Sequence, residues 1–329
     1  MRKVLTRHSG VGICSLLHLG VDGLCACQLY LLSAVMPAMQ LVAVFLTYNL
    51  LAFLTQPFTG MWIDTMRRKH WMLLAANVLL AVAVLLSSLL ITFGGESSSE
   101  KGVMLVAVLL GIGNSLFHVW GGKQTAVQTG NDITALGLFV STGALGLAVG
   151  FVCCSWGLLY AFLLMMALLS VVYVLAESPC LQPSEQSAGA DDAPSAGFSP
   201  LLVWTSILVI VLVVMFRSYA GGAFSAGTAK SQGFVLLLAA TAMLGKMAGG
   251  WMAKHLGLVR AAVLMVVVAS VCYCYRQWNV AVLLLGLFMV NCTMPITLYL
   301  ANVLLKGHEG LAFGLLAAAL IPGSLWMFF

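Results

Sequence analysis

Long apolar runs separated by short polar segments make up most of the chain. The runs lie at about 11–35, 38–61, 72–93, 102–122, 133–154 and 155–176, and then at about 201–220, 232–253, 259–275, 279–304 and 311–328. A helix needs roughly 20 apolar residues to cross a bilayer, and the runs are close to that length. The pattern therefore predicts an all-α polytopic membrane protein with about eleven transmembrane helices.

A polar segment divides these runs into six and five. Residues 177–200 contain four prolines and four acidic residues but no Lys or Arg, a composition typical of a solvated, flexible linker. We therefore predict an N-terminal six-helix bundle over 1–176, a flexible cytoplasmic linker over 177–200 and a C-terminal bundle of about five helices over 201–329.

Composition excludes several classes of protein. Hydrophobic residues make up 62% of the 329 positions and charged residues 8%, whereas soluble domains are about 25% charged. This excludes a soluble globular protein and, with it, nucleic-acid binding. The nine cysteines show no CxxC or Cys/His spacing, so we interpret them as packing thiols and predict neither a metal site nor a cofactor. No catalytic motif is present either, so we expect no enzyme activity and a driving force from an ion or substrate gradient.

Basic residues predict the orientation. With the N-terminus in the cytoplasm, ten basic residues fall in cytoplasmic segments, whereas the outer loops hold three, namely Lys101, Lys230 and Arg276. This bias matches the positive-inside rule, so we predict a multi-pass protein with a cytoplasmic N-terminus.

A short pattern occurs twice. Gly60 and Asp64 follow the second run, and Gly250 and Lys254 follow the eighth, at an offset of 190 residues. In each copy a charged residue comes four positions after a glycine and basic residues follow. Such a repeat is expected of a transporter built from two related halves. If the offset extends through both halves, the second half is one helix short, so we expect the twelfth helix to be missing.

The first copy resembles a motif of the major facilitator superfamily. Gly60, Asp64, Arg67, Arg68 and Lys69 match the loop between helices two and three of that superfamily, although Arg67 stands where a second glycine is usual. The resemblance implies a two-bundle fold and a conformational gate at these five residues. Pairing of Asp64 with Arg67 or Arg68 in one conformation would bias the equilibrium between inward- and outward-open states; the alternative is a basic loop that only fixes topology.

A finer resemblance concerns the fourth run. Gly111, Gly113, Asn114, Phe117 and His118 are similar to a segment of the fosmidomycin-resistance-type exporters, as are the residues around His18, Asp22 and Arg217. Those exporters are drug/proton antiporters of the bacterial inner membrane. The resemblance therefore implies drug efflux, drug resistance and an inner (plasma) membrane location.

Two ionisable residues share one face of the first helix. His18 and Asp22 are four positions apart, and ionisable groups inside membrane spans are costly unless they face a bundle interior or a wet cavity. We predict that Asp22 carries the coupling proton with His18 as its partner. A hydrogen-bonded pair that only fixes helix packing is the alternative.

Four further polar residues are candidate substrate contacts: Asn114, His118, Lys246 and Arg217. Counted from the helix ends, His18, His118 and Lys246 lie at similar depth, roughly 6–10 Å from the cytoplasmic side. This predicts a cytoplasm-facing vestibule for an anion. Lys246 snorkelling to the interface, and Arg217 pairing with a lipid phosphate, remain alternatives.

These observations favour a secondary active transporter that exports a small anionic or amphiphilic, fosmidomycin-like compound in exchange for protons. We expect its partners to be the substrate, protons and the bilayer, and the protein to be a monomer. A proton-coupled importer of a sugar or organic acid, and a non-transporting membrane scaffold or sensor, remain open as alternatives.

Overall fold

The computed structural model describes residues 7–66, 70–93, 100–176, 199–225 and 231–321, and these ranges fold into helices joined by turns. The first half contains α1 (Arg7–Ser33), α2 (Ala38–Leu54), α3 (Gln56–Thr65), α4 (His70–Phe93), α5 (Glu100–Thr129), α6 (Ile133–Val152) and α7 (Trp156–Ala176). The second half contains α8 (Pro200–Ser225), α9 (Gln232–Leu256), α10 (Leu258–Cys274), α11 (Val280–Leu304) and α12 (Glu309–Ala318). The predicted all-helical membrane fold is confirmed.

Helices α2 and α3 form one apolar segment that is interrupted at Thr55. Pro57 stands at the start of α3, and a proline cannot donate the backbone hydrogen bond that would continue α2. Counting Ala38–Thr65 as one segment, nine described helical segments are long and apolar enough to cross a membrane. The predicted runs at 259–275 and 311–328 correspond to the shorter α10 and α12, and residues 322–329 lie outside the described ranges.

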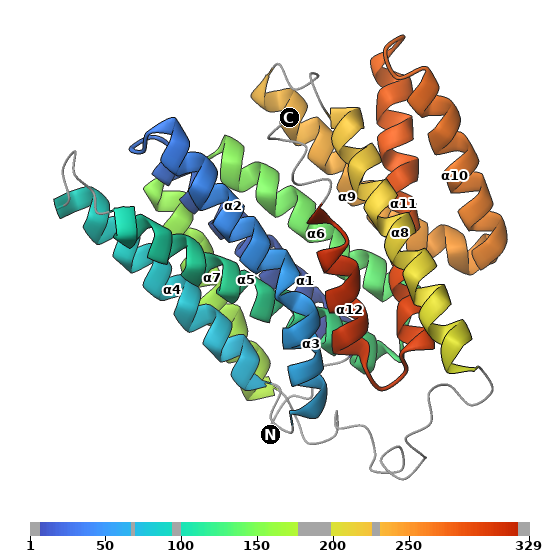
Figure 1. Cartoon of the computed structure of the whole chain (residues 1–329), viewed down its shortest axis with the longest axis horizontal. Coiled ribbons are helices and arrows are strands. Elements are labelled where there is room, and N and C mark those ends of the chain that lie inside the picture. Colours follow the sequence, from blue (N-terminus) through green and yellow to red (C-terminus); the bar gives the residue numbers. More distant parts are fainter. Residues whose placement is uncertain (1–6, 67–69, 94–99, 177–198, 226–230, 322–329) are drawn as a thin grey trace.

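The two halves meet where α6 and α12 each pack against helices of the other half. In Figure 1 helices α1–α7 lie to one side and α8–α11 to the other, with α12 between them. Helix α6 packs against α9, and α12 packs against α3 and α5. The predicted boundaries at 1–176, 177–200 and 201–329 stay a prediction, because residues 177–198 are outside the described part of the chain.

Glycines bring α6 against α1. A Cβ at Gly146 would meet the backbone of Leu19, and one at Gly150 would meet the backbone of Gly23. Only glycine permits such a close approach of two helices. The approach holds the α1 face that carries His18 and Asp22 against α6.

The outward faces of the peripheral helices are apolar. Large exposed side chains include Val78 and Leu85 on α4, Leu164 and Leu168 on α7, and Leu208 on α8. In a soluble protein such contiguous apolar surface would be unusual, whereas a bilayer solvates it.

Candidate functional site

A cavity of about 680 Å³ lies between the two halves. The first half contributes polar side chains from α1, α2, α3 and α5, and the second half contributes side chains from α8, α9, α11 and α12. Its lining includes all six of the predicted proton and substrate residues: His18, Asp22, Asn114, His118, Arg217 and Lys246. The structure thus brings together residues that are up to 228 positions apart, from His18 to Lys246.

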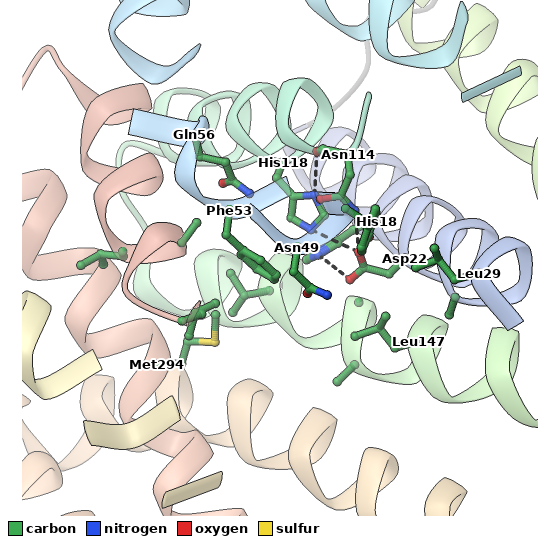
Figure 2. A pocket seen from close by; sticks show the side chains of 18 of the residues that line it. His18, Asp22, Leu29, Asn49, Phe53, Gln56, Asn114, His118, Leu147 and Met294 are labelled. Carbon is green, nitrogen blue, oxygen red and sulfur yellow. Dashed lines mark hydrogen bonds and ion pairs between the residues drawn. The ribbon is translucent and has the colours of Figure 1, made fainter. Parts of the chain in front are cut away.

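Asp22 lies between two histidines (Figure 2). Its Oδ2 is 3.3 Å from His18 Nε2, and its Oδ1 is 3.4 Å from His118 Nε2. Asn114 Nδ2 donates to the same Oδ1 at 3.4 Å and to the Tyr48 hydroxyl at 3.1 Å. Asp22 is therefore the centre of a buried polar cluster, and its predicted pairing with His18 is present.

Backbone carbonyls determine the tautomer of both histidines. His18 Nδ1 is 2.7 Å from the Phe139 carbonyl oxygen, and His118 Nδ1 is 2.9 Å from the Asn114 carbonyl oxygen. Because a carbonyl oxygen only accepts, each Nδ1 must carry a hydrogen. When these imidazoles are neutral, both Nε2 lone pairs point toward the carboxylate of Asp22, so three acceptors converge without a donor among them.

Gly143 on α6 provides the space for this cluster. A Cβ at this position would collide with the Asp22 carboxylate and the His18 ring. The sequence analysis assigned Gly143 no part in the site. In the sequence it is one glycine of several on α6, and its contact with the side chains of Asp22 and His18 distinguishes it from Gly146 and Gly150, which face the backbone of α1.

The second half supplies two cations to the cavity. Arg217 is buried and its Nη1 donates to Thr297 Oγ1 at 3.1 Å. Lys246 also lines the cavity, within electrostatic range of both Arg217 and Asp22. Both side chains therefore point into the interior, so the alternatives of a lipid phosphate for Arg217 and of snorkelling for Lys246 do not describe this conformation.

The cavity extends away from the predicted cytoplasmic side. Its lining reaches Ser33 at the end of α1, Leu41 at the start of α2 and Phe151 near the end of α6. The opposite end, where α3, α5 and α9 terminate, is here called the basic end. The prediction that a vestibule opens at the basic end is thus wrong for this conformation. There the helices α3 and α12 meet between the cavity and the basic end.

The first closure at the basic end is made by Asp64, and we call it the Asp64 contact. Asp64 Oδ1 and Oδ2 accept from the Gly310 and Leu311 backbone N–H groups at 3.0 and 2.9 Å, and Asp64 also pairs with Lys123. A Cβ at Gly60 would collide with the Gly310 carbonyl. The carboxylate thus satisfies free N–H groups at the start of α12. Of the predicted gate motif, Arg67, Arg68 and Lys69 lie outside the described ranges.

The second closure involves the other copy of the repeat, and we call it the Lys254 contact. Lys254 Nζ is 3.0 Å from Asp132 Oδ2. Asp132 caps its own helix, accepting from Thr134 N–H and Ala135 N–H at 2.9 and 3.0 Å. A Cβ at Gly250 would lie 2.5 Å from the Ile133 carbonyl oxygen. The repeat is therefore visible in space, with each copy of the glycine touching a helix of the other half.

Comparison with known proteins identifies the fold. No known protein family's sequence profile matches the chain, and no curated protein matches it in sequence. Among solved structures, the chain is similar to FucP, an E. coli fucose:proton symporter, in its outward conformation, with a TM-score of 0.68 at 11% identity over 95% of this chain and 88% of that one. The human organic anion transporter MFSD10 gives 0.65 at 15% identity, over 97% and 92% of the two chains. A bacterial homologue of the iron transporter ferroportin, in an outward-facing state, gives 0.57 at 15% identity, over 96% and 92%.

The chain has the major facilitator fold. At these identities the likeness concerns the fold alone. It agrees with the two-half architecture expected from the repeat, and it places the cavity at the junction between the halves of a major facilitator fold.

Tyr48 and Gln56 are among the polar residues of this cavity that were not predicted as site residues. The Tyr48 hydroxyl accepts from Asn114 Nδ2, and Gln56 lines the cavity with its Nε2 donating to the Ala52 carbonyl at 2.7 Å. Within the described part of the chain, Gln56 Oε1 is buried and has no hydrogen-bond partner. A buried unpaired amide oxygen beside a cavity is available to a bound donor.

Proposed function

We propose that this protein is a secondary transporter that exports a small anionic or amphiphilic compound, fosmidomycin-like in character, in exchange for protons by alternating access. The observation that carries the proposal is one cavity with two unlike walls. The first half presents the Asp22 cluster, and the second half presents Arg217 and Lys246.

The Asp22 cluster supports proton binding. With both Nδ1 atoms donating to carbonyls, the two Nε2 atoms and the carboxylate can approach at 3.3–3.4 Å only when protons or another cation lie among them. A buried group of acceptors that requires a cation is what a proton-coupled transporter needs in its binding cavity.

Arg217 and Lys246 support an anionic substrate. Within the cavity these two residues face a largely apolar lining that includes Phe45, Phe313 and Met294. Two cations in such surroundings bind an anion more strongly than exposed cations do, because water screens them less. The apolar lining suits the remainder of an amphiphilic compound.

Proton efflux from acidified everted vesicles tests the proposal. In such vesicles the cytoplasmic side faces the medium, so an exchanger releases luminal protons when its substrate is added outside. We expect fosmidomycin, or another anion of a carboxylate and phosphonate panel, to raise the luminal pH, and we expect the Asp22→Asn protein to give no such response. Glu100→Gln, which removes an exposed acid at the start of α5, is the matched control and should respond as wild type.

One observation favours a second candidate, the proton-coupled import of an organic acid. A protonated Asp22 cluster adds positive charge to the cavity that contains Arg217 and Lys246, so protons and a bare anion assist rather than oppose each other's binding. The same vesicles distinguish the two directions. An importer gives no efflux when substrate is added outside, but it carries substrate out of preloaded, acidified vesicles together with protons. An unchanged response of the Asp22→Asn protein would contradict both candidates.

A further inference from the structure

We propose that His18, Asp22 and His118 form a divalent transition-metal site, and that the transported anion enters the cavity as the chelate of such a metal. The inference rests on the proposed function and adds to it the chemical class of the substrate. It is carried by the geometry of the three side chains and their position in the cavity.

The separations fit a metal ion. Transition metals bind imidazole nitrogen and carboxylate oxygen at about 2.0–2.2 Å, so two ligand atoms on a tetrahedral ion lie about 3.3–3.6 Å apart. Asp22 oxygens lie 3.3 Å from His18 Nε2 and 3.4 Å from His118 Nε2. One ligand atom from each of the three side chains lies within 4.8 Å of the other two, so a single ion can contact all three residues.

The side chains are also held in the form that a metal requires. Both Nδ1 atoms donate to backbone carbonyls, which leaves each Nε2 lone pair free for a metal. Asn114 donates to Asp22 Oδ1 at 3.4 Å and orients the carboxylate. Such outer hydrogen bonds are the usual means by which proteins fix metal-ligating histidines and carboxylates. Two histidines and one carboxylate leave one position open on a tetrahedral ion and two when the ion expands to five ligands, which is what a chelating anion needs.

The open positions explain why the metal would arrive with an anion. A divalent ion on the deprotonated cluster leaves a net positive charge in a cavity that also contains Arg217 and Lys246. A chelating anion occupies the open positions and neutralises this charge. Exchange requires that substrate and protons compete for one site. The metal of a chelate competes with protons for the lone pairs of His18, Asp22 and His118, whereas a bare anion does not.

Cobalt spectroscopy tests the site without transport. Co²⁺ bound by imidazole and carboxylate gives visible absorption bands that differ from those of hydrated Co²⁺. We expect such bands from the purified wild type, with the Co²⁺ affinity falling by more than about 100-fold in Asp22→Asn and His118→Gln, since loss of a ligand costs more than loss of an outer partner. His255→Gln is the matched control, because His255 is an exposed histidine on α9. Equal Co²⁺ binding by wild type and Asp22→Asn, with both folded by circular dichroism, would overturn the site.

Chelation tests the substrate class. We expect substrate-driven proton efflux to fall at least about tenfold when EDTA is present on both sides of the vesicle membrane, and to return when Zn²⁺ or Co²⁺ is added in excess of the EDTA. Efflux that is undiminished by EDTA overturns the chelate and leaves the proposed proton exchange intact. Absence of efflux with and without metal, accompanied by Co²⁺ bands that depend on Asp22, contradicts the proposed function and retains the metal site.

Discussion

The two contacts at the basic end occupy equivalent positions of the repeat, yet they differ in burial. The side chains of Asp64 and Lys123 are each 3% exposed, whereas those of Lys254 and Asp132 are 58% and 36% exposed. At the Asp64 contact the acid reaches the first N–H groups of α12 in the other half. At the Lys254 contact the acid caps its own helix and only the lysine crosses between the halves.

This difference indicates where closure of the basic end is stabilised. An exposed ion pair contributes about 0.2–1 kcal/mol, whereas removing one partner of a buried pair costs about 3–5 kcal/mol. The glycines, by contrast, are equivalent, because Gly60 and Gly250 each touch a backbone carbonyl of the other half. Both copies of the repeat therefore have the same close glycine packing between the halves, but only the Asp64 contact has a buried ion pair that stabilises closure.

Matched lysine substitutions give the largest expected difference. In Lys123→Met the buried Asp64 carboxylate loses its only ion-pair partner among the described residues, so we expect the closed state to lose about 3–5 kcal/mol, a shift on the order of 10²–10⁴-fold toward opening. Hydrogen–deuterium exchange at Gly310 and Leu311, whose N–H groups donate to Asp64, should accelerate accordingly.

Lys254→Met is the control for that substitution. Its exposed pair should change exchange at the basic end only slightly, and the α6 cap by Asp132 remains. Equal acceleration in the two variants would show that burial does not separate the contacts.

Much of this arrangement was predictable from the sequence, because it depends on periodicity and local spacing. The apolar runs predicted the all-helical fold, and the pairing of His18 with Asp22 followed from their separation by four residues on one helix. The repeat predicted that Gly60 and Gly250 are equivalent. In the structure each of them lies against a backbone carbonyl of the other half.

Contacts between distant segments were not predictable in this way. The partner of Asp64 was expected in Arg67 or Arg68, but the described contacts are with Lys123 and with α12, 59 and 246 or 247 positions away. The approach of His118 to Asp22 likewise joins α5 to α1. A scan for short Cys/His spacings could not reveal this cluster, because its members belong to different helices.

Substitutions of Gly60 and Gly250 test the close packing that the two contacts share. We expect their effects to be smaller than that of Lys123→Met and larger than the pH effect at the Lys254 contact. In Gly60→Ala and Gly250→Ala the new methyl group meets backbone, which cannot rotate away. Overpacking of this kind costs about 1–3 kcal/mol, so we expect both variants to open the basic end by similar amounts in the same exchange measurement.

Gly12→Ala is the control for this pair, because a Cβ at Gly12 would meet nothing within 4 Å. A large effect of Gly60→Ala together with none of Gly250→Ala would mean that the two contacts differ in shape as well as in charge.

The pH dependence of the Lys254 contact is the smallest expected effect. Burial raises the pKa of Asp132, but the hydrogen bonds from Lys254 and the Ala135 and Thr134 N–H groups and the charge of Lys254 lower it by more, so the pKa lies below its ordinary value. A lowered pKa means that the ionised acid stabilises the folded state at neutral pH and that this contribution is lost as the pH falls through the lowered pKa.

We therefore expect wild type to exceed Lys254→Met in Tm at pH 7 by no more than about 2 °C, and the difference to shrink on acidification as Asp132 takes up its proton. Thermal unfolding of both proteins across this pH range measures the effect, and 1 M salt at pH 7 should reduce it as well, because the pair is exposed and salt screens exposed charges. A difference that grows as the pH falls would mean that Lys254 stabilises the fold through its packing or through another acid, and the electrostatic distinction between the two contacts would then rest on Asp64 alone.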